Sequence, residues 1–319
     1  MRLMRAAYAK AFNDADPLAA LEVGDRPEPE APDGWAAVEV RASSLNHHDL
    51  WSLQGVGLRA EQLPMILGCD AAGIGPGGEE VVVYPVVPSP KDPRGFTLLS
   101  EGLQGTLAER VAVPRENLVP KPAGLTFADV ACLPTAWLTA YRMLTTKGRV
   151  EEAEAVLVQG AGGGVATAAV SLAVAMGKRV YATSRDPGKR ERIAALGATA
   201  LEPGARLPER VGVVIETVGE ATFDHSQKSS AAGARIVVSG ATAGYQPTLN
   251  LRRVFALQLE ILGTSMGTPE ELAALLKLMD ARGVRPIVDS TFGFSEVKAA
   301  FAKLQAGDVF GKIVIDHAG

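Results

Sequence analysis

The feature that most constrains this chain is a glycine-rich turn near the middle of its sequence. Residues 156–166 read VLVQGAGGGVA, so an apolar run typical of a strand enters a turn of glycine and alanine, and a small-residue helix follows at 167–176. A phosphate-binding turn needs this order, because the chain must bend sharply and the N–H groups of a helix N-terminus must point at the anion. A flexible linker is the alternative interpretation of three consecutive glycines. The residues expected to hold a dinucleotide here are Gly160, Ala161, Gly162, Gly163, Gly164 and Val165.

The residues after the next predicted strand bear on which dinucleotide binds. The strand at 179–183 ends at Ser184, where dinucleotide folds place an acidic residue for the ribose 2′-hydroxyl. Here Ser184 is followed by Arg185 and, a little further on, by Lys189. Guanidinium and ammonium groups pair with phosphate oxygens, so this segment favours NADP(H) over NAD(H). A solvated basic helix start is the alternative, and Asp186 argues against a 2′-phosphate.

The composition limits the class of partner. A chain of 319 residues predicts two domains, and a net charge of −4 gives no sign of a nucleic-acid or membrane partner. The sequence starts with no signal segment, and no apolar run approaches the ~18 residues of a membrane-spanning helix. Two cysteines, Cys69 and Cys132, make no disulfide framework and fit a reducing cytoplasm. We therefore expect a cytoplasmic protein that acts on a small molecule.

The pattern of predicted elements changes along the chain. Before residue 120, β-branched runs at 36–42 and 80–84 and an alternating run at 106–113 predict a many-turned β unit, a small barrel. A helix follows at 129–144, interrupted near Pro134. Strand–helix alternation then predicts an α/β domain with a parallel sheet and right-handed crossovers. The strands of that domain are expected at 156–159, 179–183, 211–217, 234–239 and 259–264, and its helices at 165–176, 187–196, 223–230 and 251–257. The tail is expected to return to the first domain with helices at 269–281 and 295–305 and strands at 284–290 and 311–315.

Several motifs together resemble the medium-chain dehydrogenase/reductase superfamily over nearly the whole chain. They are SLNHHDLW at 44–51, PMILGCDAAG at 64–73, LPTAWLTAY at 133–141, the glycine turn at 160–166, Val218-Gly219 and FGKIV at 310–314. The closest similarity is to the zinc-free, quinone-oxidoreductase-like branch, which includes proteins named zinc-binding dehydrogenases by homology. The glycine turn departs from the family pattern only at its end, where Ala166 replaces a glycine.

The resemblance implies both a fold and a reaction. It implies a GroES-like β-barrel catalytic domain at residues 1–120 and 267–319 and a Rossmann domain, a doubly wound parallel sheet, at 121–266. The active site would lie in a cleft between the domains. The implied chemistry is hydride transfer from NADPH to a quinone, an enone or another activated carbonyl, in a protein that forms a homodimer.

The same resemblance predicts that no metal takes part. Zinc alcohol dehydrogenases of this superfamily hold zinc with Cys, His and Cys, and the corresponding positions here are Asn46, Cys69 and Thr135. A catalytic zinc needs about three N, S or O ligands from the protein, so this set is a poor one. The segment 91–102, where zinc-bearing relatives carry closely spaced cysteines, has none. An improvised site that combines His47 or His48 with Cys69 and Asp70 stays open.

Without zinc, side chains must stabilise the charge that develops on the substrate. A neutral amide or hydroxyl can do so by hydrogen bonding, so Asn46 is the first candidate and Thr135 the second. His47, or its neighbour His48, is a candidate proton relay, because histidine titrates near neutrality; a packing role is the alternative. Cys69 is a candidate nucleophile or simply a small buried residue. Asp49 is expected to orient the loop or the cofactor rather than to act as an acid.

Further cofactor contacts follow from the rule that ligands bind outside the carboxyl ends of parallel strands. By this rule the candidates are Thr139, Thr217, Gly240, Ala241, Thr264, Ser265 and Met266. Phe310 and Lys312 resemble the family segment that reaches the cofactor region, although an exposed lysine at a strand start is the alternative.

Three functions remain in competition. The first is a metal-free, NADPH-dependent reductase of quinones or enones, and the second is an alcohol dehydrogenase of the same fold. The third is a protein that binds NADPH without turnover, as a sensor or a structural protein, since a fold does not fix a function.

Overall fold

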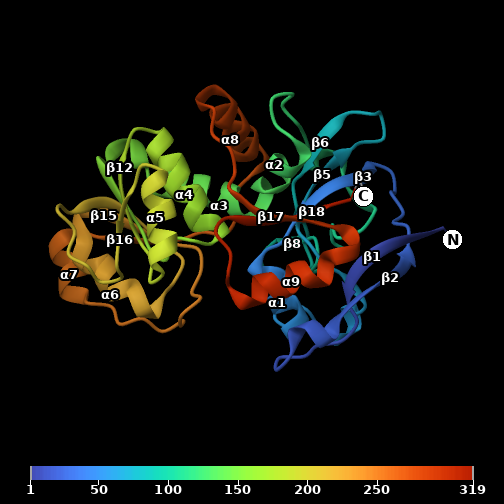
Figure 1. The fold of residues 1–319 in the computed structure, drawn as a ribbon, viewed down its shortest axis with the longest axis horizontal. Coiled ribbons are helices and arrows are strands. Elements are labelled where there is room, and N and C mark those ends of the chain that lie inside the picture. Colours follow the sequence, from blue (N-terminus) through green and yellow to red (C-terminus); the bar gives the residue numbers. More distant parts are fainter. Residues whose placement is uncertain (1, 318–319) are drawn as a thin grey trace. The chain divides into compact units, whose positions relative to one another are not determined.

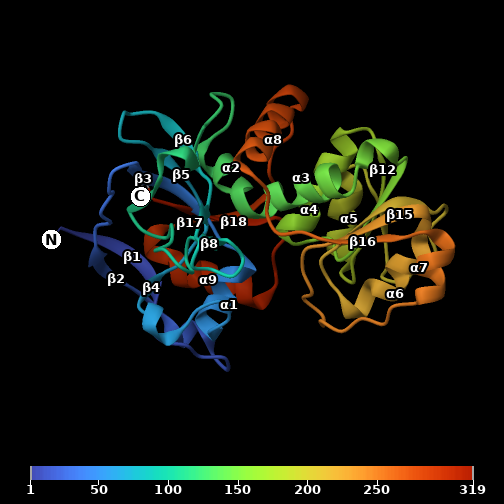
Figure 2. The same ribbon diagram turned by 180° about the vertical axis from the view of Figure 1, so that it is seen from behind.

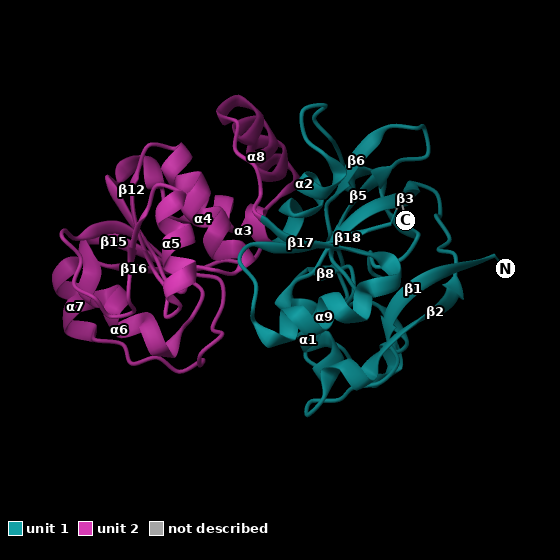
Figure 3. Ribbon diagram, viewed as in Figure 1, with its two compact units in different colours: residues 1–135, 288–319 teal, residues 136–287 magenta. Residues whose placement is uncertain are grey.

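The protein divides into two compact units, which a computed structural model describes over residues 2–317. Unit 1 joins the N-terminal part of the chain, up to Thr135, to the segment that starts at Val288, and unit 2 spans Ala136–Ile287 (Figure 3). These boundaries differ from the predicted ones, which lie after residues 120 and 266. Helix α8 (Pro269–Arg282), which was expected in the catalytic domain, lies in unit 2 and packs against α3 (Leu138–Arg142).

Unit 1 is built on β-sheets, as the short strand patterns predicted. Its largest sheet has seven strands in the described residues, in the order β10-β6-β5-β3-β18-β17, with β9 also paired to β3. A second sheet has the order β2-β1-β4, and β7 pairs with β8. The strands are β1 Leu3–Ala9, β2 Leu21–Pro27, β3 Trp35–Ser44, β4 Met65–Ile66, β5 Asp70–Ile74, β6 Glu80–Val83, β7 Val86–Pro88, β8 Phe96–Leu98, β9 Arg110–Pro114, β10 Leu118–Pro120, β17 Val288–Gly293 and β18 Lys312–Asp316.

The C-terminal segment completes this sheet. Strand β18 pairs antiparallel with β3, Val314 opposite Ser44, and β17 pairs parallel with β18 (Figure 1). The expected return of the tail to the first domain is therefore confirmed for these two strands. Helix α9 (Val297–Ala306) buries Phe301 in a core shared with α1 (His47–Gln54). The pairing brings the start of β18 beside the end of β3, which positions the polar cluster described below.

Unit 2 holds the predicted parallel sheet. Its order is β13-β12-β11-β14-β15-β16, which is the 3-2-1-4-5-6 order of a dinucleotide-binding fold when its strands are counted along the chain. The strands are β11 Ala155–Val158, β12 Arg179–Thr183, β13 Thr199–Leu201, β14 Val211–Glu216, β15 Ser230–Val238 and β16 Glu260–Gly263. Helices α4 (Gly164–Ala175), α5 (Pro187–Ala195), α6 (Glu220–Ser229) and α7 (Leu251–Leu257) connect them (Figure 2).

Three predicted elements differ from the observed ones for identifiable reasons. The helix expected at 129–144 is α2 (Phe127–Ala131), a π-helical turn at Leu133–Trp137, and α3, because Pro134 has no N–H to donate within the helix. The strand at 284–290 begins only at Val288, after Pro286, which cannot donate to a ladder. Of the expected strand at 106–113, only the part from residue 110 onward forms a regular strand, because residues 106–109 hydrogen-bond to β1 and to the segment before β5. Among the described helices, none combines the length and the apolar character needed to span a membrane.

Candidate functional site

A buried carboxylate, Asp70, lies at the centre of a polar cluster in unit 1. It begins β5 and is completely buried. Its Oδ1 accepts a hydrogen bond from Thr135 Oγ1 at 2.6 Å. Its Oδ2 accepts from Asn46 Nδ2 at 2.9 Å and from Lys312 Nζ at 3.2 Å. It shares the single hydroxyl proton of Ser44, at 2.9 Å, with Ala131 O. Four donors from three segments of the chain therefore hold one carboxylate.

Lys312 is the second charge of this cluster. Its side chain is 3% exposed. Its ammonium group donates to Leu45 O at 2.7 Å, to Asn46 Oδ1 at 2.6 Å and to Asp70 Oδ2. A lysine has three N–H donors and no acceptor, so all of its hydrogen-bonding capacity is used within unit 1.

These contacts fix the orientation of the Asn46 amide. Its oxygen must face Lys312, because an ammonium group can only donate, and one N–H of Nδ2 faces Asp70. Within residues 2–317 the second N–H of Nδ2 has no hydrogen-bond partner, and Asn46 is half-buried. Asn46 therefore offers one amide donor to a ligand, as its predicted role requires.

Thr135 is brought to the cluster by the π-helical turn at 133–137. A π turn adds a residue to a helical run and often occurs at functional sites. The single hydroxyl proton of Thr135 goes to Asp70. Thr135 therefore supports the cluster, and its hydroxyl proton is not available to a ligand in this structure.

Asp49 ties the start of α1 to the segment before β5. It is completely buried, and its carboxylate accepts from Asn46 N at 2.8 Å and from Gly68 N at 3.0 Å. Gly68 has a φ of +92°, and a Cβ there would lie 2.5 Å from Thr106 Oγ1, so this position requires glycine. The contacts agree with the predicted orienting role of Asp49.

His48 joins Cys69 to Glu101. The His48 Nε2 lies 3.0 Å from Glu101 Oε1, and its Nδ1 lies 3.6 Å from the Cys69 sulfur. Burial opposes a charge on His48, but Cys69, Asp49 and Glu101 outweigh it and raise the pKa of the imidazole well above its ordinary value. Burial raises the pKa of the Cys69 thiol, which donates to Leu99 O at 3.2 Å. This arrangement favours a buried thiol over a thiolate nucleophile at Cys69.

His47 has a different environment from His48. It is exposed, it lies 6.4 Å from the Trp51 ring between centroids, and no hydrogen bond ties its ring within residues 2–317. Partial desolvation and the charge of Lys312 lower the pKa of His47. Its ring is therefore mostly neutral near pH 7 and free to exchange a proton.

The three positions that correspond to zinc ligands do not fit a metal. The Asn46 oxygen faces an ammonium group, the Thr135 hydroxyl donates to Asp70, and Cys69 lies beside His48. Any cation near Asn46 would meet the charge of Lys312 at hydrogen-bond distance. Over the part of the chain that the structure describes, no three His, Cys, Asp or Glu side chains are grouped so that they could hold a metal ion.

In unit 2 the glycine turn has the backbone that its sequence predicted. Gly160 has a φ of +67°, and a Cβ there would lie 2.3 Å from Val218 Cγ2. The turn is held by Gly160 N, which donates to Thr183 Oγ1 at 3.1 Å, and by Ala161 N, which donates to Thr183 O at 2.7 Å. Gly163 precedes helix α4, and among the residues that the structure describes no side chain caps this helix N-terminus. Its N–H groups can therefore serve an anion.

A buried polar network behind the turn was not predicted. Gln159 Oε1 accepts from Thr183 Oγ1 at 2.7 Å, and Gln159 Nε2 donates to Ser226 Oγ at 3.0 Å. The Ser226 hydroxyl in turn donates to the buried Glu216 at 2.6 Å. The only sequence signal for this network is a glutamine and a threonine at the ends of otherwise apolar strands.

The basic segment after β12 reaches the glycine turn. Arg185 is exposed, and within residues 2–317 its guanidinium group carries no hydrogen bond or ion pair, while its backbone oxygen accepts from Arg190 Nη1 at 3.1 Å. A Cβ at Gly162, whose φ is +149°, would lie 2.9 Å from Lys189 Cδ, so the stem of Lys189 crosses the turn. Asp186 caps helix α5, because its Oδ1 accepts from Lys189 N at 2.9 Å. The residue that argued against a 2′-phosphate thus has a structural role, and Ser184 is buried beside it.

The other predicted cofactor residues fall into two groups. Since the strands of unit 2 are parallel, residues after β14, β15 and β16 lie at the same edge of the sheet as the glycine turn. These residues are Thr217, Gly240, Ala241, Thr264, Ser265 and Met266, and Thr139 is buried in α3. Phe310 and Lys312 are buried in unit 1, and Phe310 N donates to Asp289 Oδ1 at 2.9 Å. Their contact with a cofactor stays a prediction.

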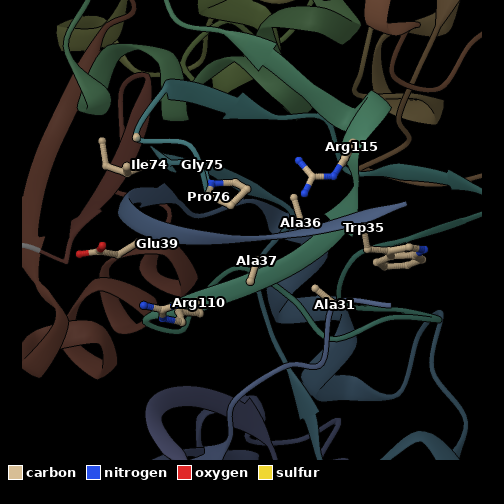
Figure 4. Close-up of a pocket in the computed structure, with 11 residues that line it drawn as sticks. Ala31, Trp35, Ala36, Ala37, Glu39, Ile74, Gly75, Pro76, Arg110 and Arg115 are labelled. Carbon is tan, nitrogen blue, oxygen red and sulfur yellow. The ribbon is translucent and has the colours of Figure 1, made fainter. Parts of the chain in front are cut away.

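A separate cavity of about 600 Å³ lies elsewhere in unit 1 (Figure 4). It is open to solvent along the first half of β3, with Trp35 and Arg115 at one end and Glu39 and Arg110 at the other. None of the predicted site residues lines it. Because Ser44 is at the opposite end of β3, this cavity is distinct from the Asp70 cluster.

Known proteins resemble this chain along its length. The family described as "Alcohol dehydrogenase GroES-like domain" matches residues 32–123, and "Zinc-binding dehydrogenase" matches residues 188–315. An acryloyl-coenzyme A reductase of Metallosphaera sedula is 30% identical over 92% of this chain and 96% of its own length. A crotonyl-CoA reductase of Streptomyces collinus is 27% identical over 90% of this chain and 79% of its own length. A solved structure described as an NAD-dependent alcohol dehydrogenase has a TM-score of 0.88 and 32% identity, covering 99% of this chain and 100% of that one.

The fold and these similarities define the class of protein. A GroES-like β unit and a Rossmann unit with a glycine turn are the two parts of a dinucleotide-dependent oxidoreductase. The chain belongs to the medium-chain dehydrogenase/reductase superfamily, which confirms the resemblance noted in the sequence.

The charge on His48 predicts a pH-dependent contribution to stability. The pKa of His48 is higher in the folded protein than its unfolded value of about 6.5. Its charged form therefore contributes fully to the free energy of unfolding below about pH 6.5, and this contribution is lost as the pH rises through the folded-state pKa. We expect His48→Gln to lower the free energy of unfolding by about 2 kcal/mol near pH 6 and by much less near pH 9. Urea unfolding across this range measures the difference. A difference that does not change with pH would contradict the charged His48–Glu101 pair.

Proposed function

We propose that this protein is an NADP(H)-dependent reductase of an α,β-unsaturated carbonyl compound, such as an enone, a quinone or an enoyl thioester, and that it uses no catalytic metal. The observation that carries the proposal is the Asn46 amide, which keeps one N–H donor available beside the Lys312 ammonium group. The names of the M. sedula and S. collinus relatives, both reductases of unsaturated acyl-CoA compounds, support the substrate class.

Unit 2 has the residues that would hold the cofactor. NADPH supplies a hydride when it is bound. The backbone of the glycine turn and the uncapped start of α4 suit its diphosphate, and the side chains of Arg185 and Lys189 suit its 2′-phosphate. The solved structure described as an NAD-dependent alcohol dehydrogenase favours NAD(H) as the cofactor instead.

Unit 1 would stabilise the charge that forms on the substrate. Reduction of the double bond places negative charge on the carbonyl oxygen, and a donor already aimed at that oxygen lowers the barrier. Asn46 supplies the donor. Asp70 and Lys312 hold the amide in place, so it need not reorient as the charge develops.

The resulting enolate must take a proton at its α-carbon. His47 suits a relay of this proton, because its ring is exposed and carries no hydrogen bond within residues 2–317, so it would take a proton from solvent and pass that proton to the α-carbon. His48 suits it less, since both ring nitrogens face other groups, Glu101 and Cys69. We therefore keep His47 as the proton relay.

Two other functions remain as alternatives. The first is an alcohol dehydrogenase, which would oxidise simple alcohols. The solved structure described as an NAD-dependent alcohol dehydrogenase supports this alternative. A sensor or structural protein would bind NADPH without consuming it. A panel of quinones, enones, enoyl thioesters and alcohols separates the three.

The polarising role of Asn46 predicts a selective loss of turnover. We expect Asn46→Ala to lower kcat about 100-fold or more, because one oxyanion donor is removed. NADPH affinity should stay within about twofold, since Asn46 belongs to unit 1. Steady-state kinetics and NADPH fluorescence titration measure the two effects, with Asn13→Ala as the control. An unchanged kcat would remove Asn46 from this role.

The 2′-phosphate assignment predicts a change in cofactor preference. We expect Arg185→Ala with Lys189→Ala to weaken NADPH binding about 100-fold and to leave NADH binding nearly unchanged, because two charge-assisted contacts are lost. Titration with both cofactors measures this, with the exposed Lys178→Ala as the control. Equal losses for NADPH and NADH would refute the assignment.

We also propose that the protein is a homodimer that joins two copies of β16. Within residues 2–317 this strand is at the end of its sheet and pairs with β15 alone, so the described chain leaves its outer edge open to a second strand. Helix α7, which precedes β16 in the chain, and β16 itself carry exposed large apolar side chains: Ile261 is 38% exposed, Leu251 65% and Phe255 72%. A second copy related by a two-fold axis would pair with the edge and cover these side chains.

The dimer proposal predicts that charge on this surface produces monomers. We expect Phe255→Asp with Ile261→Lys to halve the mass in light scattering while the melting temperature of unit 1 is kept. Leu3→Asp, which changes an exposed apolar residue on β1, is the control. A wild-type protein that is already monomeric would overturn the proposal.

The cellular location stays a prediction. Cys69 and Cys132 are both free and buried, which supports the proposal of a reducing cytoplasm.

A further inference from the structure

The chain places a fixed organic cation where its zinc-binding relatives would need room for a metal. The Asn46 oxygen, which corresponds to a metal-ligand position, accepts from Lys312 Nζ at 2.6 Å. We infer that Lys312 is a positioning residue that takes over part of the work of a metal: it holds the Asn46 amide and polarises its outward N–H toward the substrate oxygen. The inference rests on the proposed function and names the residue that makes Asn46 effective.

The first step of the argument is geometric. Lys312 lies at the start of β18, whose pairing with the end of β3 brings it beside Leu45 and Asn46. Its three donors go to a backbone carbonyl, a carboxylate and the Asn46 amide, and its side chain is 3% exposed. An ammonium group held on three sides cannot move to follow a ligand, so it acts as a fixed charge.

The second step is electronic. An amide that accepts a hydrogen bond from an ammonium group at its oxygen becomes a stronger donor at its nitrogen, because the two bonds polarise the group in the same direction. The effect is larger in a buried site, where charges are poorly screened. Lys312 therefore strengthens the hydrogen bond that Asn46 gives to a developing enolate oxygen, although Lys312 itself does not touch the substrate.

The third step explains Asp70. A lone ammonium group in this position would be costly to bury, and Asp70 neutralises it at 3.2 Å. Ser44 and Thr135 fill the remaining acceptor positions of the carboxylate. A buried ion pair is weak evidence for a role in stability, since apolar residues often replace such pairs without loss. Both members of the Lys312–Asp70 pair bond to the Asn46 amide, so we assign the pair a role in the site rather than in stability.

The decisive variant removes both charges together. Lys312→Met with Asp70→Asn leaves no unpaired buried charge, so the fold should survive. We expect kcat to fall about 30-fold or more and the NADPH dissociation constant to stay within about twofold. Lys121→Met is a matched control, because Lys121 is also buried and donates to two backbone carbonyls and pairs with Glu80. It should lower stability without changing kcat.

A double-mutant cycle separates positioning from a merely structural role. If Lys312 acts through Asn46, its effect on kcat should disappear once the Asn46 amide is gone. The triple variant Asn46→Ala, Lys312→Met, Asp70→Asn should then have a kcat less than about threefold below that of Asn46→Ala alone. Independent, multiplying losses would overturn the inference. A wild-type kcat at saturating NADPH with weakened NADPH binding would also overturn it, since Lys312 would then serve the cofactor.

A spectroscopic readout does not depend on activity. In protein labelled with ¹⁵N-asparagine, the Asn46 side-chain resonance should differ between Asp70→Asn alone and Asp70→Asn with Lys312→Met, because only the second variant removes the ammonium group at the Asn46 oxygen. It should not shift in Lys121→Met. An unmoved resonance would overturn the inference even if the enzyme reduces enones. A wild-type protein that oxidises alcohols instead would overturn the proposed function alone, because the same cycle can be measured with that reaction.

Discussion

The buried carboxylate of Asp70 is the constraint on which the candidate site depends. It draws together Ser44 from β3, Asn46 before α1, Thr135 from a π turn and Lys312 from the returning C-terminal strand. Leaving any of these donors unpaired in a dry interior would cost more free energy than the bond itself contributes. The same carboxylate therefore stabilises unit 1 and fixes the geometry of its polar groups.

Much of the fold could be predicted from local sequence. The glycine turn, the strand–helix alternation and the helix at 251–257 all depend on neighbouring residues, and the structure has them close to the expected bounds. The predicted secondary structure was wrong mainly where contacts between residues far apart in sequence determine it. Residues 106–109 bond to β1 and to the segment before β5 in place of a regular ladder, and Pro134 turns one expected helix into three short helical pieces.

The candidate site was harder to predict than the fold. Asn46, Asp49 and Thr135 were identified from motifs, but the partners that orient them were not. No spacing in the sequence shows that Glu101 approaches His48 or that Ser44 bonds to Asp70. Such pairs are formed by the return of chain segments far apart in sequence. The motif around Lys312 predicts a contact with the cofactor. In the structure its ammonium group instead donates all three of its hydrogen bonds to residues of unit 1.

The stem of Lys189 lies across Gly162, so the basic segment and the glycine turn share one packing contact. The position of the Lys189 side chain and the backbone of the turn are therefore coupled. A shorter side chain at position 189 would remove the cover of the turn, and a side chain at position 162 would push the lysine away.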